Sequence, residues 1–199
     1  MSVDIAYVQR AVDAALRLAL RDTKAITLLD MTADGFYRSF AAMIVAFPLY
    51  VVFLAGIIAA GQQLDPKEVE FGASDFVLGS LFYLLLWIAF PVVVLLVLRF
   101  LGLTARYSAL VIAYNWSAVI VMLLFDIPLV LFGLGLISPF PAAALLFTIF
   151  GFALYYRFFL GVASLEAGTS TAMAVAIINV IVFFFSFLVI DGLGGLLST

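Results

Sequence analysis

The sequence of 199 residues contains no cysteine and no histidine. Without cysteine it offers no disulfide, thiolate nucleophile or cysteine metal site. Without histidine it lacks the commonest metal ligand and the usual general base near neutral pH. Charged residues are scarce too, at 11% of the chain. These absences exclude zinc-dependent and Cys/His catalysis, so only carboxylate, lysine, serine or threonine chemistry stays open, and we expect no metal ion or cofactor.

What the chain does contain is hydrophobic residues, which make up 67% of it and give a mean hydropathy of +1.32. Ordinary soluble domains are about half apolar and about a quarter charged, so the composition predicts a membrane protein. The length suffices for about five spanning helices of ~20 residues each. The formal charge of −3 provides no basic surface for nucleic acid, and we expect no nucleic-acid partner.

Residues 3–22 predict an amphipathic helix. With 100° per residue, one side is apolar and the other polar: Ile5, Val8, Val12, Ala15, Leu16 and Ala19 against Gln9, Arg10, Asp13, Arg17 and Arg21. Such a helix lies in the headgroup plane with its arginines toward anionic lipid, or it docks on the spanning helices or a partner protein. The sequence leaves both interpretations open.

Five apolar runs predict spanning helices, so the fold class is all-α and polytopic. Their approximate bounds are 36–60, 75–98, 105–125, 142–164 and 171–190. We divide the chain into a cytosolic segment, residues 1–35, and a transmembrane domain, residues 36–199. The helix caps that we expect are Thr32 or Asp34, then Ser74 or Asp75, then Thr104, then Ser138 with Pro139 or Pro141.

Three segments outside the five apolar runs remain, two connections and the C-terminal end. Ile127–Pro141 is apolar but too short to span, and it predicts an extension of the third helix followed by a turn. The loop 61–74 carries Asp65, Glu68 and Glu70, but Pro66 stands where a metal-binding loop would have a turn glycine, so we interpret it as a solvated acidic loop. The glycine-rich end after Ile190 closes the chain.

The distribution of lysine and arginine predicts the orientation. Eight basic residues fall on the side that holds the N-terminus and only Lys67 on the other: Arg10, Arg17, Arg21, Lys24, Arg38, Arg99, Arg106 and Arg157. By the positive-inside rule the N-terminus is cytosolic, and five helices then place the C-terminus outside. Asp126 and Asp191 fall at the outer interface in this arrangement. We expect a bacterial inner membrane.

Arg157 is the first candidate site residue, because an ionisable residue in a spanning segment is a functional hypothesis by default. It lies 16 residues after Pro141, which is ~24 Å along the helix and near the cytosolic boundary. There it can act as a snorkelling anchor beside the interfacial aromatic residues Tyr155 and Tyr156. The alternative is a role in binding a lipid, a solute or a partner.

Asn115 is the second candidate, because its amide lies at mid-membrane depth and must find a partner there. Asn179 in the fifth helix is at similar depth and is one candidate for that partner, with a polar site between the third and fifth helices as a further possibility. Intramembrane aspartyl catalysis needs two facing carboxylates, and Asp126 and Asp191 are both interfacial. We therefore assign no catalytic residue and expect no enzyme.

Residues 30–190 resemble the Yip (Rab-interacting) family of five-helix membrane proteins, in particular its bacterial members. The resemblance lies in the helix order, in the basic link LTARYSALVIAYNWSAV and in YYRFFLGVASLEAGTSTAMAVAIINVIV, Tyr155–Val182. The Asp-Leu-Tyr-Gly-Pro motif of eukaryotic members is absent, and DMTADGFYRSF stands in its place. The resemblance implies a non-enzymatic protein. Eukaryotic members act in vesicle trafficking and membrane shaping with small GTPases.

Two functions follow from these patterns. The first is a non-catalytic, Yip-like integral membrane protein that scaffolds partners or organises membrane lipid, in contact with the bilayer and with a protein partner or a second copy of itself. The second is a small transporter or channel, or a membrane subunit of a larger complex, with a polar path near the third and fifth helices.

Overall fold

The computed structural model describes residues 3–65 and 72–197, with side chains to residue 194. All regular structure in this part of the chain is helical. The elements are α1 (Ile5–Ala19), the 3-10 helix η1 (Thr23–Leu28), α2 (Ala33–Ser39), α3 (Ala41–Leu64), α4 (Ala73–Phe100), the 3-10 helix η2 (Thr104–Arg106), α5 (Tyr107–Gly133), α6 (Pro139–Leu165) and α7 (Thr169–Leu197).

Five of the helical segments are long and apolar enough to cross a membrane, which confirms the predicted number. They cover Ala33–Leu64, Ala73–Phe100, Thr104–Gly133, Pro139–Leu165 and Thr169–Gly194. Large apolar side chains remain exposed on their outer faces, among them Ile88, Phe140 and Phe147. In water such a surface would be unfavourable, whereas lipid tails solvate it well, so the protein is an integral membrane protein.

The helix ends differ from the predicted ones in two places. The first span begins earlier, at Ala33, where the Thr32 hydroxyl caps the helix by accepting a hydrogen bond from the Gly35 amide at 3.0 Å. The last helix does not end at Ile190 but continues through the glycine-rich segment to Leu197. Glycine weakens a helix by only about 1 kcal/mol, and in a bilayer no water competes for the backbone groups.

Two of the predicted caps need correction. Thr104 does not cap the third spanning helix; it opens the 3-10 turn η2, and α5 begins at Tyr107 without a side-chain cap. In α4, Asp75 acts from inside the first turn, accepting a hydrogen bond at 2.8 Å from the amide of Gly72, which is the N-cap. As predicted, α6 starts at Pro139 after the N-cap Ser138.

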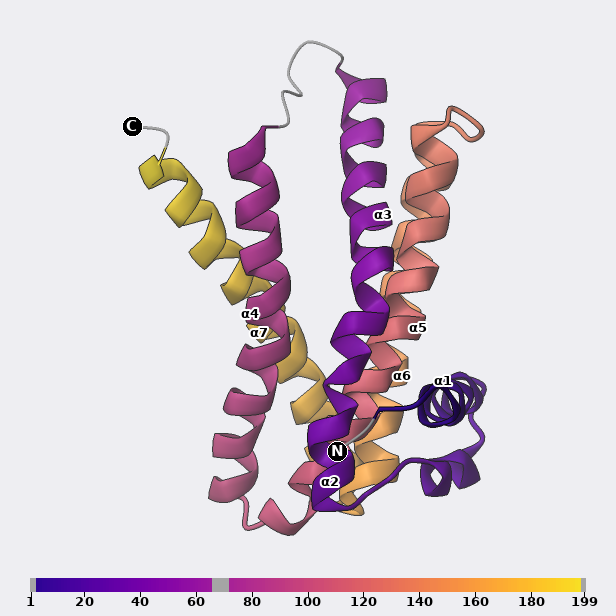
Figure 1. Ribbon diagram of the computed structural model, residues 1–199, viewed down its shortest axis with the longest axis vertical. Helices are drawn as coiled ribbons and strands as arrows, with labels where there is room; N and C mark the ends of the chain where they lie inside the picture. Colours follow the sequence, from indigo (N-terminus) through magenta and orange to yellow (C-terminus); the bar gives the residue numbers. More distant parts are fainter. Residues whose placement is uncertain (1–2, 66–71, 198–199) are drawn as a thin grey trace.

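Helix α5 forms the centre of the bundle, since α3, α6, α1 and α2 all pack against it, while α7 packs on α4 and α6. Figure 1 shows α1, η1 and α2 gathered toward one end of the bundle and the last turns of α7 at the other end. We call the former the N-terminal end of the bundle. Small residues allow α3 and α5 to approach closely: the Cα of Gly133 faces Ala59, and that of Gly56 faces Leu129.

Helix α1 lies across the bundle, nearly perpendicular to its long axis (Figure 1), and packs on α5 and α6. Its buried residues are Tyr7, Ala11, Ala14, Ala15 and Leu18. The predicted apolar face is correct only in part: Ala15 is buried and Val8, Val12 and Ala19 pack against the core, but Ile5 and Leu16 are 77% and 48% exposed. The buried face is rotated by roughly 100° about the helix axis, one residue step, because three alanines admit the neighbouring helices more closely than the larger side chains would.

Aromatic residues fix α1 in this position. The Tyr156 hydroxyl donates a hydrogen bond at 2.5 Å to the Ala15 carbonyl, and the rings of Tyr7 and Trp116 meet edge to face with centroids 5.7 Å apart. Arg21 Nε donates to the Tyr155 hydroxyl at 2.6 Å. The inner face of α1 is therefore docked on the spanning helices, which is one of the two arrangements that the sequence left open.

Arg10 and Arg17, the two basic residues within α1, are exposed. Arg17 pairs with Asp22, with a distance of 2.6 Å from Nη2 to Oδ2, and this hydrogen bond holds the pKa of the Asp22 carboxyl below its usual range. Asp22 also accepts from the Lys24 amide at the start of η1. Arg10 lies on the outer face. Of the three arginines proposed to face lipid, two thus have protein partners.

Candidate functional site

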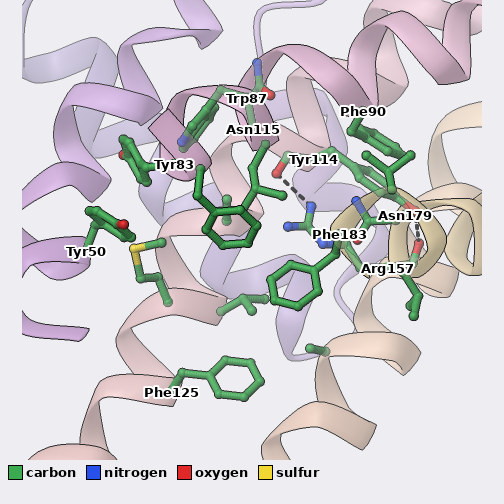
Figure 2. A pocket seen from close by; sticks show the side chains of 18 of the residues that line it. Tyr50, Tyr83, Trp87, Phe90, Tyr114, Asn115, Phe125, Arg157, Asn179 and Phe183 are labelled. Atoms are coloured by element: carbon green, nitrogen blue, oxygen red, sulfur yellow. Dashed lines mark hydrogen bonds between the residues drawn. The ribbon is translucent and has the colours of Figure 1, made fainter. Parts of the chain in front are cut away.

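A cavity of about 440 Å³ lies between the five spanning helices, and Figure 2 shows it from close by. This volume is in the range of small-molecule sites. Its walls are mostly aromatic and aliphatic, with a few polar groups. The lining residues are Tyr50 and Phe53 of α3; Phe82, Tyr83, Leu86, Trp87, Phe90 and Pro91 of α4; Tyr114, Asn115, Ala118, Val121, Met122 and Phe125 of α5; Phe150, Ala153, Leu154 and Arg157 of α6; Asn179, Val180, Val182, Phe183 and Phe184 of α7.

Arg157 reaches into this cavity from α6. Its Nη1 atom donates two hydrogen bonds to α5, one to the Tyr114 carbonyl at 2.8 Å and one to the Ser117 hydroxyl at 2.7 Å. The guanidinium carbon lies 4.6 Å from the centre of the Tyr114 ring. The side chain is thus turned inward, as Figure 2 shows, and does not snorkel outward as a rim anchor.

Tyr114 holds Arg157 from a second direction. Its hydroxyl donates a hydrogen bond at 2.9 Å to the Arg157 carbonyl, while its own carbonyl accepts from the guanidinium. The Tyr114 ring stacks on Phe90 of α4, with centroids 4.5 Å apart and an interplanar angle of 5°. These contacts join α4, α5 and α6, so the position of the guanidinium is fixed before any ligand arrives.

Asn115 and Asn179 both line the cavity, but they do not form the predicted pair in the described part of the chain. The Asn115 amide instead donates at 2.9 Å to the hydroxyl of Ser39, the last residue of α2. The helix is interrupted between α2 and α3, and the Ser39 hydroxyl at this interruption is buried inside the bundle. No signal in the sequence indicated the interruption. Asn179 is left with its amide facing the cavity.

The remaining candidate residues lie away from the cavity. Tyr156 is buried and bonds to α1, while the partly exposed Tyr155 accepts a hydrogen bond from Arg21, just after α1. Arg10 and Arg17 lie exposed on α1. Of the acidic loop, Lys67, Glu68 and Glu70 lie outside the described residues.

An aromatic wall on α3 and α4 was missed. Tyr50 and Tyr83 stack with centroids 4.5 Å apart, and Tyr83 also contacts Trp87. The Tyr83 hydroxyl donates to the Met43 carbonyl at 2.5 Å, and the Tyr50 hydroxyl donates to the Gly79 carbonyl. The spacing of Tyr83 and Trp87, four residues apart on one helical face, was visible in the sequence and would have indicated this wall.

One buried carboxylate lies apart from these groups. Asp126 is 5% exposed, and neither of its carboxyl oxygens has a hydrogen-bond partner among the described residues. The prediction placed Asp126 at the outer interface, at the end of the strongly apolar part of the third helix. Because α5 continues to Gly133, Asp126 lies inside the helix, ~10 Å before its end.

Comparison of the chain with protein-family models, with curated proteins and with solved structures found no match. The Yip-type resemblance therefore stays a prediction, and the case for a function depends on the geometry of the cavity.

Proposed function

We propose that this chain is a non-catalytic integral membrane protein that organises membrane lipid by taking up a lipid molecule in the cavity lined by the five spanning helices. The observation that carries the proposal is the cavity itself, with apolar walls and a fixed guanidinium. A membrane-embedded cavity with such walls accommodates a hydrocarbon chain, and the few polar groups orient it.

The position of α1 supports this function. Its inner face is docked on α5 and α6, while Ile5, Leu16 and Leu20 on its outer side stay exposed. A helix that lies across the bundle with an exposed apolar edge suits the boundary between headgroups and acyl chains. We further propose that the N-terminus is cytosolic and the membrane a bacterial inner membrane, as the basic residues at the N-terminal end favour.

Fluorescence of Trp87 tests the uptake of lipid, because the chain has only one other tryptophan, Trp116, which lies outside the cavity lining. In a Trp116→Phe background, lipids with brominated acyl chains should quench Trp87. Ala153→Phe fills the cavity and should reduce this quenching about fivefold. The matched control is Ala143→Phe, an exposed position on the same helix, which should leave quenching unchanged. Equal quenching in both variants would contradict uptake into the cavity.

A small transporter or channel is the second candidate function, because Asn115, Arg157 and Asn179 from three helices line one cavity. The two functions differ in a flux assay. With lipid uptake as the function, Asn115→Leu should preserve expression and cause no loss of solute flux in reconstituted vesicles. A measured flux that this substitution abolishes would favour the transporter.

A further inference from the structure

Arg157 is the only charged residue among the described residues that line the cavity. A cation at membrane depth is normally paired with an acidic residue, with backbone carbonyls or with water. In the described part of the chain no ion pair includes Arg157. Its bonds to the Tyr114 backbone carbonyl and the Ser117 hydroxyl supply acceptors of the expected kind but no negative charge. The cavity therefore carries one full positive charge with no counter-charge from the lining residues.

The unused donors of Arg157 have a defined geometry. All its side-chain hydrogen bonds within the described residues come from Nη1, which leaves Nε and Nη2. These two nitrogens form one edge of the planar guanidinium, the edge that binds a carboxylate or phosphate through two parallel hydrogen bonds. Asn179, which also lines the cavity, adds a further amide donor to the lining.

The apolar part of the cavity extends away from this charge. Arg157 lies ~12 Å before the C-terminal end of α6, on the side of the N-terminal end of the bundle. Phe125 lies ten residues beyond Asn115 on α5, ~15 Å further toward the opposite end, and Phe150 lies ~10 Å from Arg157 along α6. The cavity thus has a cationic end toward the N-terminal end of the bundle and an aromatic part that extends toward the opposite end.

We propose that the ligand of this cavity is an anionic lipid, with its phosphate or carboxylate on the Nε–Nη2 edge of Arg157 and its acyl chain along the aromatic walls. This inference rests on the proposed function and adds the charge of the headgroup. A free anion would match the guanidinium but would leave the apolar walls uncovered. A lipid fits both ends, and a net negative charge compensates the cation as a zwitterionic headgroup does not.

The test uses the full-length Trp116→Phe protein in nanodiscs, with brominated phosphatidylglycerol and brominated phosphatidylcholine as probes. Both carry a phosphate, but only the first has net negative charge. Trp87 should reach half-maximal quenching at an about tenfold lower mole fraction of phosphatidylglycerol, the factor expected for one charge-assisted interaction. Arg157→Gln should bring the ratio of the two half-maximal mole fractions close to one. Arg157→Lys keeps the charge but loses the paired donors of the guanidinium, so it should retain part of the difference between the two lipids.

Arg99→Gln is the matched control, because Arg99 is exposed at the end of α4 and should leave the tenfold ratio intact. Equal quenching by both lipids in the parent protein would overturn the anionic headgroup while leaving lipid uptake standing. Quenching by neither would overturn the proposed function as well. Inorganic phosphate at millimolar concentration should not displace brominated phosphatidylglycerol; if it does, the site binds a free anion, and the assignment to a lipid is wrong.

Discussion

Replacing Gly133 by leucine should lower the free energy of unfolding by about 3 kcal/mol. A Cβ at this position would lie 2.7 Å from the Cβ of Ala59, and 3.6 Å from that residue's carbonyl carbon. Both residues belong to long spanning helices, so neither can move without shifting a helix backbone. Small residues at such crossings allow close packing, which stabilises helix pairs where no hydrophobic effect is available. The measurement is equilibrium unfolding in mixed micelles.

The matched control for this substitution is Gly151→Leu in α6. A Cβ on Gly151 meets no atom within 4 Å, so the added side chain extends outward into lipid and should leave the stability within about 0.5 kcal/mol of the parent or raise it slightly. Equal losses in the two variants would mean that the contact between α3 and α5 does not determine the result, because helix propensity favours leucine over glycine at both positions.

The contact between α3 and α5 matters for the cavity as well as for stability. Phe53 and Tyr50 line it from α3, about one and two turns away from Gly56. A Cβ on Gly56 would lie 2.9 Å from the Cβ of Leu129. Separating the two helices at Gly133 would therefore widen the same wall that the acyl chain is proposed to contact.

The number of spanning helices could be predicted from the sequence because it depends only on the length of apolar runs. The helix ends could be predicted only in part. The extension of the third helix beyond Asp126, followed by a turn, is confirmed, since α5 runs to Gly133. The end of the last helix was wrong, because beyond Ile190 the backbone continues as helix through a glycine-rich segment. The break at Phe40, which positions Ser39 against Asn115, has no proline or glycine to mark it.

The direction of single side chains was harder to predict than their depth. Counting residues placed Arg157 near the cytosolic boundary, but depth does not say whether a side chain points outward or inward. In a helix that is apolar on every side, no amphipathic pattern indicates which face meets the other helices. The same difficulty affected α1, where the buried face consists of three alanines with Tyr7 and Leu18, while Ile5 and Leu16 are exposed.

Asp126 was predicted to lie at the outer interface, and the structure adds that its side chain is buried in the bundle. An aspartate at the outer interface would be solvated by water and headgroups. Inside α5 it is almost fully enclosed, and in the described residues no donor reaches either carboxyl oxygen. Burying a carboxyl group without partners is unfavourable in a protein interior and in a membrane alike.

Replacing Asp126 by leucine should therefore raise the free energy of unfolding by about 2 kcal/mol, a typical cost of leaving a buried polar group without a hydrogen-bond partner. Asp126→Asn removes the charge but keeps a polar group without partners, so its gain should be smaller. The exposed Asp191 provides the control, and Asp191→Leu should change the stability by less than about 0.5 kcal/mol. All three are measured by the same equilibrium unfolding. A loss of stability in Asp126→Leu would mean that the carboxyl group makes a stabilising interaction, and it would identify Asp126 as a second polar site of the bundle.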